Sequence, residues 1–547
     1  MFPRELPKTR HNLRVLSEMR EMADAYLESA PECLPYSLFI LFQTTGERAE
    51  YEEKYFDHRR RLNSLFFTYL DTKDEKYYLP LMDALFAVLD EYSWAVPAHI
   101  KESNVPGTVG KIDLFSAETA YALAEIDSIL GDKLPAMIRE RIRFETDRRI
   151  LTPFFEGNQN YPKSNWSAVQ SAGVIAALVR LFPERLDETL PRLLPIIQQF
   201  LDSYNDDGCC MEGTLYWIYG FGFFTYGAEL LREGTKGKIN LFDNPKVERM
   251  AHFFENVTFR DGYVVPFADS PLQCKMRVGL ASFLHREFGV DYPDSNLIFA
   301  VKDDTRFRFA DILHDLYWSE DFDTAGKVRL GEFFYEDSGW YIYRTEGLSF
   351  CAKGGHNLEP HNHNDIGNFV LFDGEKTVLG DLGWEEYVRT YFGPRRYLDF
   401  ILTPSTGHSV PIIDGKTQTT VDKKAEIIEA KDGVFALDIG SAYGVEHFLR
   451  TMKMEGNTFT VTDECDLPFS ERIVTGYEPK VDGDTVLIDT LRLTTSTPCD
   501  IEVTANPYRP RRIICGEHLK EVETAYFITL TPKAPTASLT LTFTRLA

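Results

Sequence analysis

The chain has 547 residues and a formal net charge of -25 at pH 7. A chain of this length exceeds what one hydrophobic core serves, so we expect two or three domains. The acidic balance argues against a nucleic-acid-binding protein, which needs a basic surface to displace counterions from phosphates.

The sequence also lacks membrane and export signals. No apolar run reaches the length of a bilayer-spanning helix, and no apolar segment follows residues 1–8 as it does in a signal peptide. The eight cysteines include no CxxC pair, so we expect free thiols. These features predict a cytoplasmic protein that does not interact with membranes.

Two kinds of periodicity divide the chain. Before residue 325, apolar residues recur at helical spacing, and afterwards short alternating runs with Gly-rich turns predict strands. Helices followed by strands indicate separate domains rather than a βαβ weave. We expect a helical domain over 1–325, with a hinge at Asp323–Lys327, then β domains over 326–466 and 467–547. The periodic helical segments are Leu13–Leu27, Tyr77–Leu89, Ala117–Leu130, Ala168–Leu181, Leu190–Leu201, Tyr216–Leu231, Val247–Phe254, Val278–Phe288 and Phe309–Tyr317.

Two segments of the helical half carry candidate chemistry. A Pro-bearing loop delivers Asn165 to the start of an apolar helix, although on residue type alone Ser164 or Asn165 is better explained as an N-cap. Further on, an acidic, Gly-rich segment precedes an aromatic helix on which Tyr216 and Tyr219 lie one turn apart. Such aromatic stripes are more often core. The acidic lead-in nevertheless predicts a cleft in which a tyrosine hydroxyl meets a ligand.

The β half contains a histidine cluster. On an extended backbone, His361 and His363 of the His-Asn-His-Asn-Asp segment would face the same side. Neutral imidazole is the commonest metal ligand and the commonest general base. Asp381 and His408 each follow a strand-like run, at loop sites where a ligand can be offered. The pattern predicts acid–base or metal chemistry.

An anionic ligand of this acidic protein must meet a local basic patch. Arg395 and Arg396, between Tyr391 and Tyr397, are candidates for such a patch and equally for a solvated surface. The run at 59–61 is better explained as a solvated surface.

Together these segments resemble the heparinase II/III-like polysaccharide lyases over most of the chain. The resemblance implies an N-terminal (α/α) toroid followed by antiparallel β-sheet and β-sandwich domains, with the active site between them. The matching motifs, in chain order, are Ser-Asn-Trp at 164–166, Asp-Gly-x-x-x-Glu-Gly-x-x-Tyr-Trp-x-Tyr-Gly at 207–220, His-x-His-Asn-Asp-x-Gly-x-Phe at 361–369, Gly-Asp-x-Gly at 380–383 and Thr-Gly-His at 406–408.

The resemblance also implies a reaction. A lyase removes the C5 proton of a uronate and expels the O4 leaving group, which leaves a C4–C5 double bond. By resemblance, Asn165 neutralises the substrate carboxylate, Tyr216 is the acid and also a candidate base, and His361 is the base or the carboxylate partner. Tyr219 is the alternative acid and Tyr391 a second tyrosine. The expected substrate-binding residues are Trp166, Glu212, Arg395 and Arg396.

The resemblance further implies a structural zinc ion held by His363, Asp381 and His408. Three such ligands suit tetrahedral zinc with one further position. Some relatives carry a histidine directly after the neutralising Asn, where this chain has Trp166. That departure favours Tyr216 and His361, rather than a second histidine of the helical domain, for the proton transfers.

Other functions remain open. A helical-toroid glycoside hydrolase would use Glu212 and Asp207 as a carboxylate pair. A cupin-like metal-dependent oxygenase would also use His-x-His, but the Glu it requires is replaced by Gly367 or Asn368. A non-catalytic sugar-binding protein would not need His361. The expected partner is an anionic uronate-containing oligosaccharide or polysaccharide, glycosaminoglycan-like or alginate-like, and the sequence leaves homo-oligomerisation open.

Overall fold

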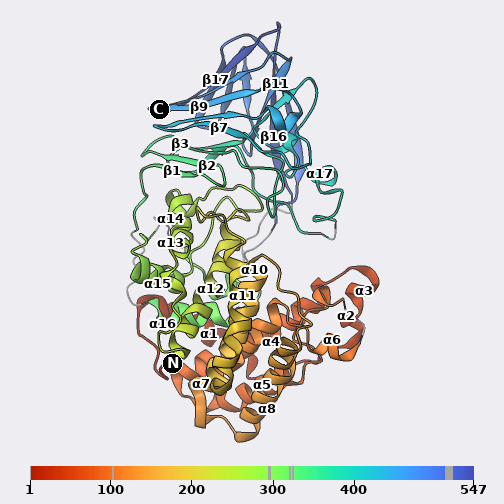
Figure 1. The fold of residues 1–547 in the computed structure, drawn as a ribbon, viewed down its shortest axis with the longest axis vertical. Helices are drawn as coiled ribbons and strands as arrows, with labels where there is room; N and C mark the ends of the chain where they lie inside the picture. The colour runs from red at the N-terminus through yellow and green to blue at the C-terminus, as the bar shows by residue number, and fades with distance from the viewer. Residues whose placement is uncertain are drawn as a thin grey trace.

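The computed structural model describes residues 2–101, 104–292, 297–319, 322, 326–388, 390–511 and 522–546. Helices occupy one end of the elongated molecule and strands the other (Figure 1). The predicted order of helices followed by antiparallel sheets is therefore confirmed. The expected hinge at Asp323–Lys327 falls partly outside the described residues, because 323–325 are not among them.

The helical half extends to residue 317. Each of the nine periodic segments overlaps a helix, whereas the longest helix, α4, was not predicted because nearly all of its faces are buried and its pattern is not amphipathic. The helices are α1 (Arg10–Tyr26), α2 (Tyr36–Phe39), α3 (Leu41–Thr45), α4 (Ala49–Thr72), α5 (Tyr78–Asp90), α6 (Val105–Val109), α7 (Leu114–Leu130), α8 (Ala136–Thr146), α9 (Thr152–Glu156), α10 (Asn165–Ala176), α11 (Leu186–Leu201), α12 (Thr214–Gly234), α13 (Pro245–Ala251), α14 (Phe253–Val257), α15 (Val278–Phe288) and α16 (Phe309–Tyr317).

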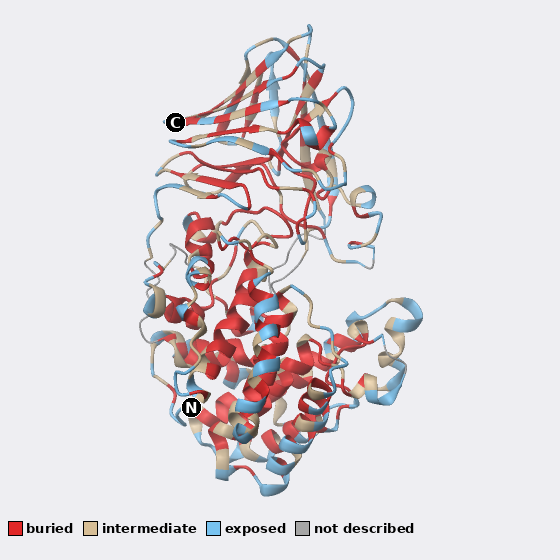
Figure 2. Cartoon of the chain, in the orientation of Figure 1, coloured by how far each residue is buried: buried red, intermediate tan, exposed pale blue. Residues whose placement is uncertain are grey.

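Close contacts of α10 with α7 and α12 organise this half. A Cβ atom at Gly173 would lie 2.5 Å from the Ala117 carbonyl oxygen, and one at Gly220 would lie 2.8 Å from the Asn165 Cβ. Glycine at these two positions therefore lets the helix backbones approach. The second contact brings Tyr216, one turn before Gly220 on α12, towards the start of α10. Figure 2 shows the buried residues concentrated along the faces that these helices turn to one another.

The β half contains three antiparallel sheets. Their strand orders are β1-β2-β3-β4-β5, β12-β13-β14-β17-β10-β9-β8-β7 and β15-β16-β11-β6. Two short helices, α17 (Arg396–Asp399) and α18 (Gly440–Tyr443), lie in the connections. The strands are β1 (Gly331–Tyr335), β2 (Trp340–Arg344), β3 (Ser349–Lys353), β4 (Phe369–Phe372), β5 (Thr377–Leu379), β6 (Pro411–Ile413), β7 (Glu426–Lys431), β8 (Val434–Asp438), β9 (Leu449–Glu455), β10 (Thr458–Glu464), β11 (Phe469–Thr475), β12 (Lys480–Asp482), β13 (Thr485–Ile488), β14 (Leu491–Thr495), β15 (Cys499–Tyr508), β16 (Glu523–Pro532) and β17 (Ser538–Arg545).

Strands from both sides of residue 467 share sheets. Strand β10 pairs with β17, and β11 pairs with β6. The same hydrophobic core also takes side chains from all three sheets. The expected boundary between 326–466 and 467–547 therefore does not coincide with a break between sheets.

The first sheet joins the two halves of the molecule. Trp340 and Val370 belong to the same apolar core as the helices. Polar contacts follow the same path, because Arg344 donates to the backbone oxygens of Glu255 at 2.7 Å and Thr258 at 2.9 Å. One face of this sheet therefore covers the end of the helical half.

Within the described residues, no single helix combines the length and hydropathy that crossing a bilayer requires, and one strongly bent pair, Asn165–Leu181 with Pro183–Leu201, meets that test by length and composition only. The cysteines whose positions are described are free: Cys33, Cys209, Cys210, Cys274, Cys351, Cys465 and Cys499.

Gly213, between Glu212 and α12, lies close to Ser270, and a substitution there tests this close approach. Its backbone (φ 100°, ψ 173°) lies in a region that only glycine adopts readily, and a Cβ there would lie 2.8 Å from the Ser270 Cβ. We expect Gly213→Ala to lower the free energy of unfolding by about 2–4 kcal/mol in denaturant titrations. Gly237→Ala is the control, since Gly237 has φ 78° but open space around its Cβ position. Equal losses in the two variants would contradict the close approach at Gly213.

Candidate active site

The carboxylate of Asp269 is the centre of a polar cluster where the two halves meet. Asp269 belongs to the helical half and is fully buried. Burial alone raises the pKa of Asp269, but hydrogen bonds from His361 and His363 and the charge of Arg396 outweigh it, so that pKa lies well below its usual range. The five donors are His361 Nδ1 at 2.7 Å, His363 Nε2 at 3.1 Å, Tyr387 Oη at 2.7 Å, Tyr391 Oη at 2.6 Å and Arg396 Nη2 at 3.0 Å.

The backbone at His361 differs from the extended conformation that the sequence suggested. Its φ is 57°, in the left-handed region, so His361 and His363 do not alternate as they would on a strand. They nevertheless converge, because His361 binds one oxygen of Asp269 and His363 binds the other. The Asp269 carboxylate, rather than a pleated strand, brings the two imidazoles together.

The second ring nitrogen of His361 faces Glu212. His361 Nε2 lies 3.3 Å from Glu212 Oε2. Burial raises the pKa of Glu212; the charge of His361 lowers it and Asp269 raises it further. The structure thus brings these two predicted site residues, one from each half, into direct contact.

Tyr216 lies against the same imidazole. The ring centroids of Tyr216 and His361 are 4.2 Å apart, and the Tyr216 hydroxyl is 3.0 Å from that of Tyr387. Burial raises the pKa of Tyr216 to about 12, although Arg511 acts in the opposite direction. The hydroxyl therefore keeps its proton at neutral pH, as a proton donor requires.

Asn165 is the first residue of α10, but Ser164 is the N-cap. The Ser164 side chain accepts a hydrogen bond from the Trp166 backbone nitrogen, so capping does not use the Asn165 amide. Asn165 Nδ2 instead lies 3.4 Å from Glu212 Oε2. This contact orients the Asn165 amide towards the cluster around Asp269. The next residue, Trp166, packs beside His99, with ring centroids 4.9 Å apart.

Other predicted residues are engaged elsewhere. The Tyr219 hydroxyl donates to Glu118 at 2.6 Å. Asp207 accepts hydrogen bonds from the backbone of Cys209 and Ser338, both at 2.9 Å.

The two candidate arginines of the basic patch have different environments. Arg395 is exposed and pairs with Asp399 at 2.6 Å. Arg396 is buried, where it binds Asp269 and donates to the Asn362 backbone oxygen at 3.2 Å. Arg59 and Arg61, expected on a solvated surface, are also buried.

The sequence analysis missed Asp269, Tyr387, Trp384 and Arg511. The sequence gives only weak local signals for them. Asp269 follows the apolar run 263–268, and the other three residues lie among aromatic and basic residues. Arg511 lies over the Tyr387 ring at 3.6 Å and the Trp384 ring at 4.3 Å.

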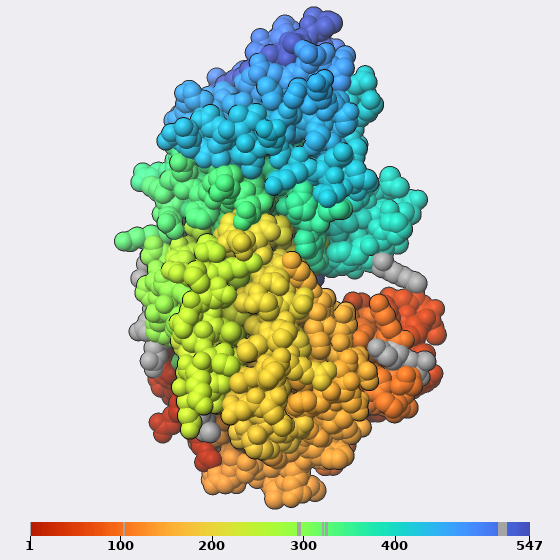
Figure 3. Space-filling model, viewed as in Figure 1, coloured from red at the N-terminus to blue at the C-terminus, as the bar shows by residue number. Residues whose placement is uncertain are grey.

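On the surface, Figure 3 shows a hollow between the lobe that carries α2, α3 and α6 and the segment that carries α17.

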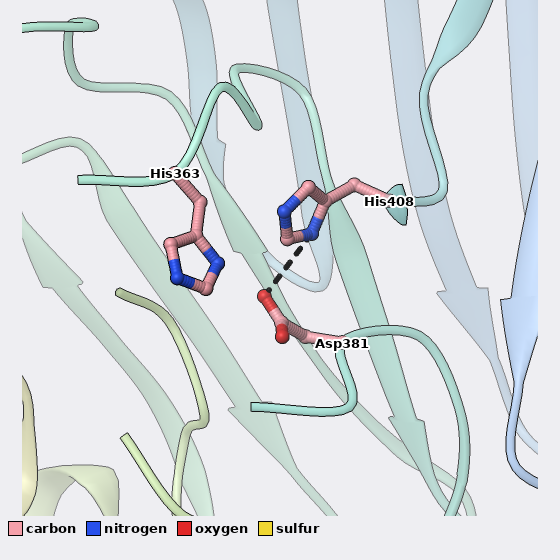
Figure 4. A group of neighbouring side chains, drawn as sticks. All are labelled: His363, Asp381 and His408. Atoms are coloured by element: carbon pink, nitrogen blue, oxygen red, sulfur yellow. Dashed lines mark ion pairs between the residues drawn. The ribbon is translucent and has the colours of Figure 1, made fainter. Parts of the chain in front are cut away.

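His363, Asp381 and His408 form a second, fully buried group (Figure 4). One ligand atom from each lies within 4.8 Å of the others, and His408 Nδ1 is 3.3 Å from Asp381 Oδ2. Within the described residues, His363 Nδ1 and His408 Nε2 are buried without a hydrogen-bond partner. Two unpaired imidazole nitrogens beside a carboxylate fit a zinc site.

Comparisons with known proteins support the fold. No family model and no curated protein matches the chain. A crystal structure of heparinase III matches with TM-score 0.69 and 14% identity, over 99% of this chain and 87% of that chain. A heparan sulfate lyase from Pedobacter heparinus matches with TM-score 0.63 and 16% identity, over 99% and 84%. The chondroitin AC lyase of Streptomyces coelicolor A3, in complex with chondroitin sulphate, matches with TM-score 0.59 and 11% identity, over 99% and 80%. At these identities the likeness establishes the helical-then-β architecture that the motifs implied.

The buried group predicts a metal content. Protein purified without chelator should contain about one zinc per chain by elemental analysis. His363→Ala and His408→Ala should lose the metal and melt at lower temperature, whereas His447→Ala, which alters an exposed histidine paired with Asp438, should keep both properties. Absence of metal together with unchanged melting temperatures would reduce the group to a hydrogen-bonded polar network.

Proposed function

We propose that this protein is a polysaccharide lyase that cleaves uronate-containing chains by β-elimination. The observation that carries the proposal is the convergence of Asn165, Glu212 and Tyr216 from the helical half with His361 from the β half. An amide, a buried carboxyl, a protonated phenol and an oriented imidazole are the groups that such an elimination requires. The shared fold of the heparin, heparan sulfate and chondroitin lyases supports this assignment.

Neutralisation of the substrate carboxylate comes first, because the C5 proton is too weakly acidic beside a free carboxylate. The Asn165 amide can donate to that carboxylate and to the enolate that develops from it. Burial raises the pKa of Glu212, which favours its neutral form, and a neutral carboxyl also donates a hydrogen bond. Asn165 and Glu212 therefore supply the electrostatic part of the mechanism.

Proton transfer follows. With Nδ1–H donated to Asp269, the Nε2 atom of His361 carries the lone pair that takes the C5 proton once the substrate has displaced its 3.3 Å contact with Glu212 Oε2. The C5–H electrons form the C4–C5 double bond, the C4–O4 bond breaks, and the Tyr216 hydroxyl protonates the departing O4. The raised pKa of Tyr216 disfavours the phenolate that a base role would need, so we assign Tyr216 the acid role and His361 the base role. No water is consumed.

The zinc site has a supporting role in this proposal. Zinc on His363, Asp381 and His408 would cross-link the loops that carry them. His363 also binds Asp269, so the same loops orient His361. The protein residues alone carry out the proton transfers.

Hydrolysis is not proposed as a second function. It needs a pair of carboxyl groups facing the glycosidic bond. Asp207 is instead engaged with the backbone of Cys209 and Ser338, and Asp269 is saturated by its five donors. Neither Asp207 nor Asp269 is therefore available as the second carboxyl group beside Glu212.

The first activity test uses Tyr216→Phe. Removing the donor hydroxyl should lower kcat by about 10²–10⁴ and leave the fold intact. Tyr219→Phe is the matched control on the same helix, because its hydroxyl is engaged by Glu118. The measurement is ultraviolet absorbance of the unsaturated uronate, across a panel of glycosaminoglycan and alginate oligomers. No absorbance with any substrate would reject the lyase function, and loss of activity in Tyr219→Phe alone would move the acid role to Tyr219.

The second activity test is the alkaline side of the pH profile. A donor is lost as pH rises through its pKa, and the pKa of Tyr216 is raised to about 12. We therefore expect kcat to remain flat from about pH 8 to about pH 10 when Tyr216 is the acid. A fall in kcat within that range, in protein that circular dichroism shows to be folded, would contradict this assignment.

A further inference from the structure

A cavity of about 190 Å³ lies next to Tyr216, and the proposed elimination chemistry does not account for it. Its walls come from α12, from residues 303–311 and from the β half. Tyr216 and Trp384 form part of the wall. This cavity is therefore continuous with the proton donor. Its charged lining residues are Arg277, Arg306, Arg308 and Arg511, against Asp303, Asp304 and Asp311.

The acidic residues that line the cavity are already paired. Asp304 is bound by Arg277 at 3.0 Å and Arg308 at 2.9 Å. Asp311 lies 3.2 Å from Arg277. Asp303, which also lines the cavity, binds Lys275 at 2.9 Å. Neither Arg277 nor Arg308 is thus left as an unpaired charge.

Arg306 and Arg511 differ from those two arginines. Among the described residues, neither has a carboxylate oxygen within ion-pairing distance. The Nη1 atom of Arg511 is buried without a hydrogen-bond partner, and its guanidinium lies over the rings of Tyr387 and Trp384. Arg306 donates through Nη1 to the neighbouring Thr305 hydroxyl. Arg306 and Arg511 are therefore the lining cations without an acid partner, and the four arginines of the lining outnumber its three aspartates by one.

The pKa of Arg306 is consistent with a local excess of positive charge. Burial lowers the pKa of Arg306, and the nearby positive charges of Arg308 and Arg511 lower it further, against the attraction of Glu52 and Asp304. Cations held together in a partly dry cavity are unfavourable unless an anion compensates them. Burial also lowers the pKa of Arg511, although Tyr216, Tyr387 and Asp269 raise it. No carboxylate among the described residues pairs directly with either guanidinium, so a ligand anion would complete the charge balance.

We propose that Arg306 and Arg511 form a subsite for an anionic substituent, a sulfate ester or a carboxylate, on the sugar next to the bond whose oxygen Tyr216 protonates. This inference rests on the proposed lyase function for the identity of the sugar. A planar guanidinium binds either anion through two parallel N–H groups. The cavity volume of about 190 Å³ corresponds to several water molecules at about 30 Å³ each, which leaves room for a sulfate or carboxylate group.

The cavity arginines are better placed to bind an anionic substrate than the basic patch at Arg395 and Arg396. An acidic chain with a net charge of -25 must meet an anionic substrate through local cations. The basic patch predicted from the sequence serves poorly, because Arg395 pairs with Asp399 and Arg396 with Asp269. Arg306 and Arg511 come from segments that the sequence analysis did not single out.

A direct binding experiment tests the subsite without relying on activity. Inorganic sulfate is titrated calorimetrically into the full chain at constant ionic strength, with chloride as the balancing anion. We expect saturable binding to the wild type and binding weaker by about tenfold or more to Arg306→Gln. Arg20→Gln is the matched control, since it removes the same charge from an exposed residue paired with Asp71.

Equal sulfate binding by all three proteins, or no saturable binding by the wild type, would overturn the subsite. If Arg306→Gln does not fold, Arg306→Lys replaces it. That variant keeps the charge but loses the two-pronged geometry, so it should also bind sulfate more weakly than the wild type. Unchanged affinity in a folded Arg306→Lys would overturn the proposal equally.

A kinetic experiment identifies the source of the anion. Two oligosaccharides with the same uronate backbone, one sulfated and one not, are compared by ultraviolet absorbance. We expect Arg306→Gln to raise KM by about tenfold or more with kcat nearly unchanged. If the occupant is a sulfate ester, only the sulfated substrate is affected, and if it is a carboxylate, both are affected equally.

The kinetic result also separates the two proposals. Unchanged KM values for both substrates in an active, folded Arg306→Gln would overturn the subsite and leave the lyase function standing. If the wild type forms no unsaturated product from any uronate oligosaccharide, the proposed function fails, and the sulfate titration alone then decides whether Arg306 and Arg511 form an anion site.

Discussion

The structure of the candidate site depends on one buried carboxylate. Asp269 is removed from water at a desolvation cost of several kcal/mol, which its five donors offset. Those donors lie in two segments of the β half, 361–363 and 387–396, and the acceptor lies in the helical half. The contact between the halves, the position of these loops and the orientation of His361 therefore depend on the same carboxylate. The left-handed backbone of His361 persists because this network holds it.

The same carboxylate connects the proposed acid with the proposed base. Tyr387 donates to Asp269 and contacts the Tyr216 hydroxyl, while His361 donates to the same oxygen of Asp269. The negative charge of Asp269 opposes ionisation of Tyr216, while Arg511 acts in the opposite direction. The network thus helps to keep the phenol protonated, as an acid requires, and holds the His361 ring in place through its Nδ1 contact.

Sequence reasoning predicted what is encoded locally. The change of period near residue 325 predicted helices followed by sheets, and motifs of three to fourteen residues pointed to Asn165, Tyr216 and His361, which lie together in the structure. Asp269, Tyr387 and Arg511 were not found, since each is a single common residue whose surroundings are assembled from distant segments. The long helix α4 was missed because polar residues such as Arg59 are buried in it beside apolar ones, which erases the amphipathic period. No local feature of the sequence marked the expected boundary near Leu467, and strand pairing across it is a long-range property that a local pattern does not reveal.

The position of β17 in the eight-stranded sheet has a consequence for biosynthesis. This strand pairs with β10 on one side and β14 on the other, although about 75 residues separate it from β10 in the sequence. Until residue 545 has left the ribosome, both neighbours present an open hydrogen-bonding edge, the kind of edge that pairs with other chains. The helical half can form long before that moment, whereas the sheet that supports the second half closes last. The nascent chain therefore has its greatest need for chaperone protection late in synthesis, over the β strands rather than the helices.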